Sequence, residues 1–312
     1  MKAESRLKRD GAPQPSSHTK GPRLGAHMSI AGGLSTALLR GQETGCDTIQ
    51  IFTKNNNQWS AKALTEAEVR AYRELRQGTA IWPILAHDGY LINVASPDRR
   101  LYRKSLTALG GEVARAAALD IPTLIMHPGA HRGSGEAEGI RRVAEALDTV
   151  LAGSTASPVS ICLETTAGQG SSLGYRFEHL AAIRDAVTQR ERVGICLDTC
   201  HIFAAGYEIR GRKPYERTIR ELDAVIGLAH LKCIHLNDSQ RELGSRVDRH
   251  AHIGRGHIGL EGFRLFINDP RLRHIPMILE TPKEGDPVGN DRRNLAVLRS
   301  LAVLRLRRGR AR

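Results

Sequence analysis

The sequence lacks long hydrophobic runs. No stretch approaches the ~18 uninterrupted apolar residues that a membrane span requires. The first 23 residues carry charge but no apolar segment of the signal-peptide type, and Glu4 and Asp10 disagree with the acid-poor composition of transit peptides. We therefore expect a protein of the cytoplasm that makes no contact with a membrane.

Cysteine is scarce, and the five that are present form an odd number. Cys162, Cys196 and Cys233 each lie inside an apolar run, which predicts reduced core residues. Cys196 and Cys200 form a C-x-x-x-C pattern that matches no common zinc-ribbon or thioredoxin spacing, so we assign them no ligand role. The sequence also has no Ser or Cys elbow motif that would indicate a covalent enzyme intermediate.

Acidic residues are too few to balance the basic ones. Forty-six Lys and Arg against 33 Asp and Glu give a formal charge of +13 and a pI near 10.0. This excess favours a polyanionic partner, although charge alone raises association rates and non-specific binding without defining a reaction. Part of it lies in residues 1–23 and 304–312, which we predict to be a disordered basic extension and a basic tail around one domain, 24–303.

Eight short β-rich runs organise the rest of the chain, each followed by a loop and a segment of helical period. The runs are GAHMSI (25–30), TIQIFT (48–53), WPILAH (82–87), TLIMH (123–127), VSICLE (159–164), VGICLD (193–198), CIHLN (233–237) and PMILE (276–280). Near-continuous apolar strands alternating with amphipathic helices predict a parallel sheet covered by helices. Eight such units favour a single α/β barrel, the (β/α)8 or TIM barrel, over an open doubly wound sheet.

The segment GRGHIG, Gly254 to Gly259, matches the G-x-G-x-x-G pattern of dinucleotide-binding sites. It follows a polar loop, has no strand before it and lacks an acidic residue on a second strand about 20 residues later. We interpret it as a loop.

Polar residues gather at the ends of the predicted strands, and barrel enzymes place their active sites at that face. The residues at or just beyond these ends are His87, His127, Glu164, Asp198, His201, His235, Asp248, His250 and Glu280. Any one of them alone is explained as a helix N-cap or a hydrogen-bonded histidine. Together they would crowd one pocket with polar groups, which is unfavourable unless cations lie among them.

Five imidazoles and four carboxylates suit zinc, manganese or iron. At three protein ligands per ion, nine groups suffice for two or three metals with positions left open for water and substrate. In a strongly basic protein, such a metal cluster indicates phosphodiester hydrolysis.

Several segments of the chain resemble the signatures of the endonuclease IV family of apurinic/apyrimidinic endonucleases, from about Gly25 to about Pro282. They are GAHMSIAGG, FTKNNNQW, AHDGYLIN, HPGAH, LETTAGQGSSLG, LDTCHIFAAGYEIR, HLNDSQRELGSRVDRHAHIGRGHIG and ILETP. The resemblance implies a TIM barrel with three Zn²⁺ ions, one or more replaceable by Mn²⁺ or Fe²⁺. It further implies cleavage of duplex DNA 5′ to an abasic site by a zinc-activated hydroxide, leaving a 3′-hydroxyl and a 5′-deoxyribose phosphate, and removal of 3′ blocking groups.

By the same resemblance, His87, His127 and Glu164 hold one zinc. Glu164 bridges to a second zinc and, as the catalytic residue, helps to deprotonate the attacking water. Asp198, His235 and Glu280 complete the second set of ligands, and His201, Asp248 and His250 form the third. His131 is interpreted as a residue that supports the ligands and does not itself bind a metal.

The resemblance also implies DNA contacts. Tyr90 and Leu91 would wedge into the duplex, unless they only pack against the start of a helix. Asn57 stands where some relatives carry an Arg that fills the gap left by the base, and Gly89 stands where Ser or Ala is common. Arg249 would contact a phosphate or brace the ligands beside it. We expect a monomer that acts on DNA containing abasic sites or blocked 3′ ends, at the nucleoid in a prokaryote.

Two rival functions remain at this point: a metal-dependent sugar isomerase or epimerase, which shares the barrel layout, and a non-catalytic binder of damaged DNA. The isomerase offers no explanation for the charge of +13. The binder leaves unexplained why all nine ligand positions carry competent residues.

Overall fold

The computed structural model describes residues 21–154 and 159–303. Eight parallel strands form a closed barrel in the order β1-β10-β7-β6-β5-β4-β3-β2. The strands are β1 (Leu24–Met28), β2 (Thr48–Phe52), β3 (Ile84–His87), β4 (Thr123–Met126), β5 (Ser160–Glu164), β6 (Val193–Asp198), β7 (Leu231–His235) and β10 (Met277–Leu279). The predicted (β/α)8 barrel is therefore confirmed.

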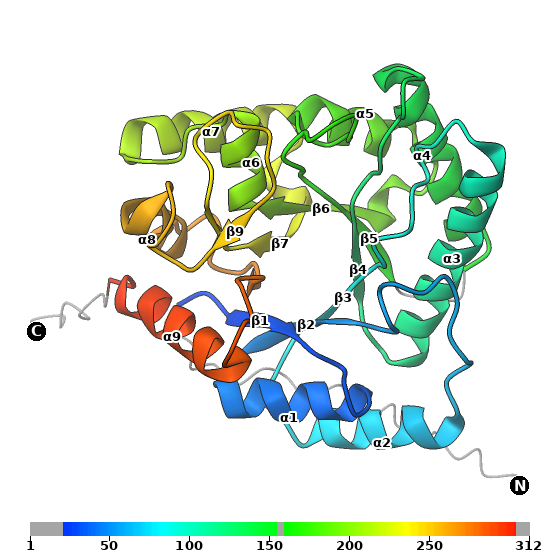
Figure 1. The fold of residues 1–312 in the computed structure, drawn as a ribbon, viewed down its shortest axis with the longest axis horizontal. Coiled ribbons are helices and arrows are strands. Elements are labelled where there is room, and N and C mark those ends of the chain that lie inside the picture. The colour runs from blue at the N-terminus through cyan, green and yellow to red at the C-terminus, as the bar shows by residue number, and fades with distance from the viewer. Residues whose placement is uncertain (1–20, 155–158, 304–312) are drawn as a thin grey trace, which may run out of the picture.

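Helices surround this barrel (Figure 1). They are α1 (Leu34–Thr44), α2 (Glu66–Gln77), α3 (Arg99–Ala118), α4 (Glu136–Ala152), α5 (Phe177–Ala186), α7 (Arg212–Val225), α8 (Gly259–Asn268) and α9 (Pro287–Ser300). Helix α2 begins with the expected capping box, in which the Thr65 hydroxyl accepts from the Glu68 N–H and the Glu68 carboxylate accepts from the Thr65 N–H. Among the described residues, no helix is both long and apolar enough to cross a membrane.

The barrel interior contains a separate apolar layer directly below the strand ends. It consists of Leu85, Ile125, Cys162, Cys196, Cys233 and Ile278, all buried. Each of these residues precedes a predicted ligand by two positions, and side chains two apart on a strand face the same side. The apolar layer therefore supports the predicted ligands from below.

Three details differ from the sequence-based expectations. Strand β7 begins at Leu231, two residues before the predicted run, and ends at His235, so this histidine closes its strand. The loop after β7 contains an unpredicted hairpin, β8 (Asp238–Ser239) paired antiparallel with β9 (His250–Ala251). A short helix, α6 (Thr199–Ala205), follows β6 directly.

Residues Leu24 to Ser300 contain all strands and helices of the described segments. The predicted basic extension, apart from Gly21 to Arg23, and the predicted basic tail lie outside the described residues.

Candidate metal centre

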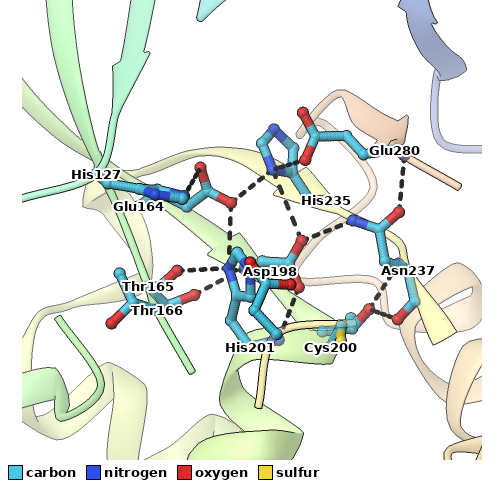
Figure 2. A network of polar contacts seen from close by, with 12 residues as sticks. His127, Glu164, Thr165, Thr166, Asp198, Cys200, His201, His235, Asn237 and Glu280 are labelled. Atoms are coloured by element: carbon cyan, nitrogen blue, oxygen red, sulfur yellow. Dashed lines mark hydrogen bonds and ion pairs between the residues drawn. The ribbon is translucent and has the colours of Figure 1, made fainter. Parts of the chain in front are cut away.

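The nine predicted ligands converge at the carboxyl ends of the strands, as Figure 2 shows for most of them. Their ligand atoms form three groups, and within each group these atoms lie within 4.8 Å of one another. The groups are His87, His127 and Glu164; Glu164, Asp198, His235 and Glu280; and His201, Asp248 and His250. The three groups have the same membership as the three ligand sets implied by the resemblance.

Glu164, at the end of β5, is the shared member and is fully buried. Its Oε2 atom lies 3.0 Å from Nε2 of His87 and 3.2 Å from Nε2 of His127. Its Oε1 atom lies 2.9 Å from Nδ1 of His235 and 3.3 Å from Nδ1 of His201. The two oxygens thus face different histidines, which is the geometry expected of a bridging carboxylate.

Three histidines of the centre use one ring nitrogen to donate a hydrogen bond to a backbone carbonyl. Nδ1 donates from His87 to Asp88 (2.9 Å), from His201 to Thr165 (2.8 Å) and from His250 to Glu280 (3.0 Å). Because a carbonyl only accepts, Nδ1 must carry the hydrogen, and Nε2 of the neutral ring is then bare.

These bare nitrogens face carboxylate oxygens. The His87 nitrogen faces Glu164, while those of His201 and His250 lie 3.1 and 3.3 Å from the two oxygens of Asp248. Within the described residues, Nε2 of His201 and of His250 makes no hydrogen bond. A lone pair opposite a carboxylate repels it unless a cation lies between them, so the arrangement fits bound metal.

The opposite charges of the histidines and carboxylates shift one another's pKa values in favour of the charged forms. Burial by itself lowers the pKa of His87, but the hydrogen bond and charge of Glu164 outweigh it and raise the pKa to about 9. Burial also opposes the charged form of His235, yet Glu280 and Glu164 hold its pKa well above the usual value. Burial would raise the pKa of Glu164, but His235 and His127 hold it well below its ordinary range.

A neighbouring polar residue that the sequence did not single out, Asn237, holds the carboxylate of Asp198 and the backbone of Glu280. The side chain of Asn237 donates to Oδ2 of Asp198 (2.6 Å) and accepts from the backbone N–H of Glu280 (2.7 Å). Both contacts are drawn in Figure 2. Asn237 thereby ties the end of β6 to the residue that follows β10.

The GRGHIG segment binds an anionic side chain of the protein itself, the carboxylate of Asp238. The fully buried carboxylate of Asp238 accepts hydrogen bonds from the backbone N–H groups of Gly254 (2.9 Å), Gly256 (3.0 Å) and Ile258 (2.9 Å). Glycine is required at position 256, because a Cβ there would lie 2.3 Å from the carbonyl oxygen of Ser239. The segment anchors the β8–β9 hairpin, which carries His250.

Two cavities open at the centre, and Tyr90 lines both. The first, about 430 Å³, is also lined by His87, His127, His201 and Arg249. The second, about 1140 Å³, is also lined by Asn57, His250 and Glu280.

The expected DNA contacts lie around these cavities. Tyr90 is 67% exposed and packs edge-on against Phe52, with 5.5 Å between ring centroids. Asn57 and Arg249 are exposed, whereas Leu91 is half-buried. Tyr90 and Leu91 form a turn, and the next helix begins only at Arg99, so packing against a helix start does not explain them.

Gly89 brings two loops into close contact. A Cβ at Gly89 would lie 3.0 Å from the carbonyl oxygen of Asn56 and 3.2 Å from Nζ of Lys54. The missing side chain therefore lets the loop before Tyr90 approach the loop that carries Asn57.

His131 and the cysteines take no part in these three groups. Nδ1 of His131 accepts from the backbone N–H of Gly135 at the start of α4.

All five cysteines are buried and free. Sulfur atoms do approach the centre, since Cys196 and Cys233 group with His235, and Cys200 with Asp198 and His250. Burial raises the pKa of Cys200 to about 12, which keeps this thiol protonated at neutral pH and disfavours it as a ligand.

The fold and the donor set define a class of barrel enzyme. Residues 39–304 match the family described as the xylose isomerase-like TIM barrel. The chain is 55% identical over 280 residues to a protein named probable endonuclease 4 from Chloroflexus aurantiacus, covering 90% of this chain and 98% of the relative. A crystal structure of endonuclease IV from Thermus thermophilus superposes with a TM-score of 0.79 at 37% identity, covering 90% of this chain and 98% of that one.

The chain belongs to the endonuclease IV family, and it is a metal-dependent nuclease of DNA repair. A D-tagatose 3-epimerase-like protein also superposes, with a TM-score of 0.68 at 18% identity, and covers 89% of this chain and 96% of its own. At that identity the likeness shows the shared barrel alone. Family membership therefore decides against the sugar isomerase and the non-catalytic binder.

Proposed function

We propose that this nuclease hydrolyses the phosphodiester bond 5′ to an abasic site in duplex DNA, leaving a 3′-hydroxyl and a 5′-deoxyribose phosphate. The observation that carries the proposal is the set of bare histidine nitrogens facing Glu164 and Asp248. We further propose that the protein acts as a monomer and also removes 3′ blocking groups, which present the same type of phosphodiester.

Three Zn²⁺ ions would occupy the three groups of ligands. When bound, they would supply the positive charge that lowers the pKa of a water molecule and neutralises the phosphate oxygens. Glu164 would act as the catalytic residue by orienting the attacking water and helping to deprotonate it, because its two oxygens face the first and second groups of ligands.

The residues around the cavities would bind the damaged strand. Tyr90 stands exposed between the two cavities, where an aromatic ring can replace the stacking lost at a missing base. A missing base also makes extrusion of the nucleotide less costly. Leu91 would support Tyr90, Asn57 would fill part of the base gap without the charge of an arginine, and Arg249 would contact a phosphate.

The test is cleavage of an end-labelled duplex carrying one tetrahydrofuran abasic analogue, with a metal count for each protein. This analogue cannot undergo β-elimination, so a cut that exposes a 3′-hydroxyl demonstrates hydrolysis. We expect the intact protein to hold about three zinc ions and to cut, and Glu164→Gln not to cut. A zinc-loaded protein that leaves the duplex whole would overturn the proposal.

A further inference from the structure

A buried glutamine on β2 contacts two of the proposed ligands. Gln50 is fully buried and lies inside the barrel mouth. Its Nε2 atom donates to Oε1 of Glu280 (2.5 Å) and lies 2.9 Å from Nδ1 of His27, while its Oε1 atom lies 2.8 Å from Nε2 of His235. One amide side chain therefore contacts both His235, the last residue of β7, and Glu280, the residue that follows β10.

Elementary hydrogen-bond chemistry fixes the orientation of this amide. A carboxylate only accepts, so the NH2 group of Gln50 must face Glu280. The amide oxygen then faces His235, and an oxygen only accepts, so Nε2 of His235 must carry a hydrogen. In the neutral ring, Nδ1 is consequently bare.

The bare nitrogen of His235 points at the second group of ligands. Nδ1 lies 2.9 Å from Oε1 of Glu164 and 3.3 Å from Oε2 of Glu280. If the ring had the opposite tautomer, its hydrogen would occupy the position of the metal and its lone pair would face Gln50. The same amide holds Oε1 of Glu280, leaving Oε2 free on the side of His235.

We infer that Gln50 is a positioning residue for the second metal: it sets the tautomer of His235 and the direction of the Glu280 carboxylate. The inference rests on the proposed ligand assignment. Groups that hydrogen-bond to metal ligands in this way typically change metal affinity by roughly 10–100-fold when they are removed. We expect the first and third metals to be unaffected, because the side chain of Gln50 contacts His27, His235 and Glu280.

The barrel offers a matched control two residues earlier on the same strand and the same face. Thr48 is also fully buried, and its hydroxyl donates to the carbonyl oxygen of Pro83, away from the ligands. Thr48→Val removes one buried hydrogen bond from β2 without changing any contact of the metal centre.

The experiment measures zinc affinity by competition with a chelator, without DNA, for the full-length wild type, Gln50→Met and Thr48→Val. We expect one of about three zinc ions to bind roughly 10–100-fold more weakly in Gln50→Met, and all to bind normally in Thr48→Val. Thermal melting followed by circular dichroism checks that each variant folds, and Gln50→Leu replaces Gln50→Met if the longer side chain is not accommodated.

The outcomes separate the two hypotheses. Equal zinc affinities in Gln50→Met and Thr48→Val, with a wild type that holds three ions, would overturn the role of Gln50 and leave the ligand sets intact. A wild type that binds no zinc would overturn the ligand sets themselves, and the role of Gln50 with them.

Discussion

Asp198 caps the helix that carries His201. Its Oδ1 atom accepts a 2.8 Å hydrogen bond from the backbone N–H of His201, while Oδ2 lies 3.8 Å from a ring nitrogen of His235 and of His250. The N-cap and the candidate metal ligand, which the sequence presents as alternatives, are thus combined in one side chain.

Replacing Asp198 with Asn separates the two roles. Asn caps a helix about as well as Asp, so the start of α6 is retained, while the negative charge next to His235 and the hydrogen bond from Asn237 are lost. We expect zinc affinity and cleavage of the abasic duplex to fall by at least about 100-fold. Both are measured on the same preparation.

The control for this variant is Asp98→Asn, which alters the N-cap of α3. The Asp98 carboxylate accepts from the backbone N–H groups of Arg100 and Leu101 and belongs to none of the three ligand groups. The Asp98→Asn protein should retain full zinc content and activity. Equal losses in both variants would show that capping, not charge, explains the effect at Asp198.

The pH dependence of the metal-free protein follows from the raised pKa of His87. Its pKa in the folded state is about 9, above the usual 6.5 of an unfolded histidine. Protonation of His87 therefore adds on the order of 3 kcal/mol to the free energy of unfolding. This contribution is complete below pH 6.5 and is lost as the pH rises through about 9. Urea unfolding in the presence of a chelator, between pH 6 and 10, measures this loss.

Zinc should suppress that pH dependence, because it binds the deprotonated ring and replaces the proton opposite Glu164. His131→Gln is the control, since His131 lies outside the three groups of ligands. The metal-free His131→Gln protein should follow the wild-type pH profile. A metal-free wild type whose stability is flat between pH 6 and 10 would contradict the ion pair between His87 and Glu164.

Tyr90 is expected to contribute to DNA binding and not to metal binding. Stacking of a base on an aromatic side chain is worth roughly 1–3 kcal/mol, so Tyr90→Ala should weaken binding of the abasic duplex by about 10–100-fold at constant zinc content. Leu39, a 51% exposed residue on α1, provides the control, and Leu39→Ala should bind as the wild type does. Similar binding by both variants would remove the wedge role.

Asp238 is expected to stabilise the hairpin that carries His250. In Asp238→Asn, an NH2 group replaces one of the two oxygens that accept from the GRGHIG amides, leaving buried donors unpaired. The free energy of unfolding in urea should fall by about 2–3 kcal/mol. Asp223→Asn changes an exposed carboxylate that accepts one N–H from Leu228, and it should cost under about 1 kcal/mol. Equal effects at the two positions would argue against the anchoring role.

The strand ends could be predicted because two independent patterns coincide there. An apolar run marks each strand, and the first polar residue after it marks the mouth of a parallel barrel, as at His87 and Glu164. The start of β7 was missed because the exposed Lys232 interrupts the apolar run after Leu231. The barrel fold could be predicted from the number of alternating strand and helix units alone.

Residues that act through hydrogen bonds were harder to find. Gln50 and Asn237 are neutral amides inside or beside apolar runs, so neither charge nor periodicity distinguishes them. The role of Asp238 depends on backbone N–H groups, which every non-proline residue possesses. Only the folded arrangement shows which of these groups meet a ligand or an anion.

The closed barrel also governs when the protein becomes able to act during its synthesis. The second group of ligands joins Glu164 to Glu280, and Glu280 directly follows β10, the strand that closes the barrel against β1. A growing chain therefore holds most of its ligands long before it can assemble them. The second group of ligands is therefore complete only once the last strand of the barrel and Glu280 have been synthesised.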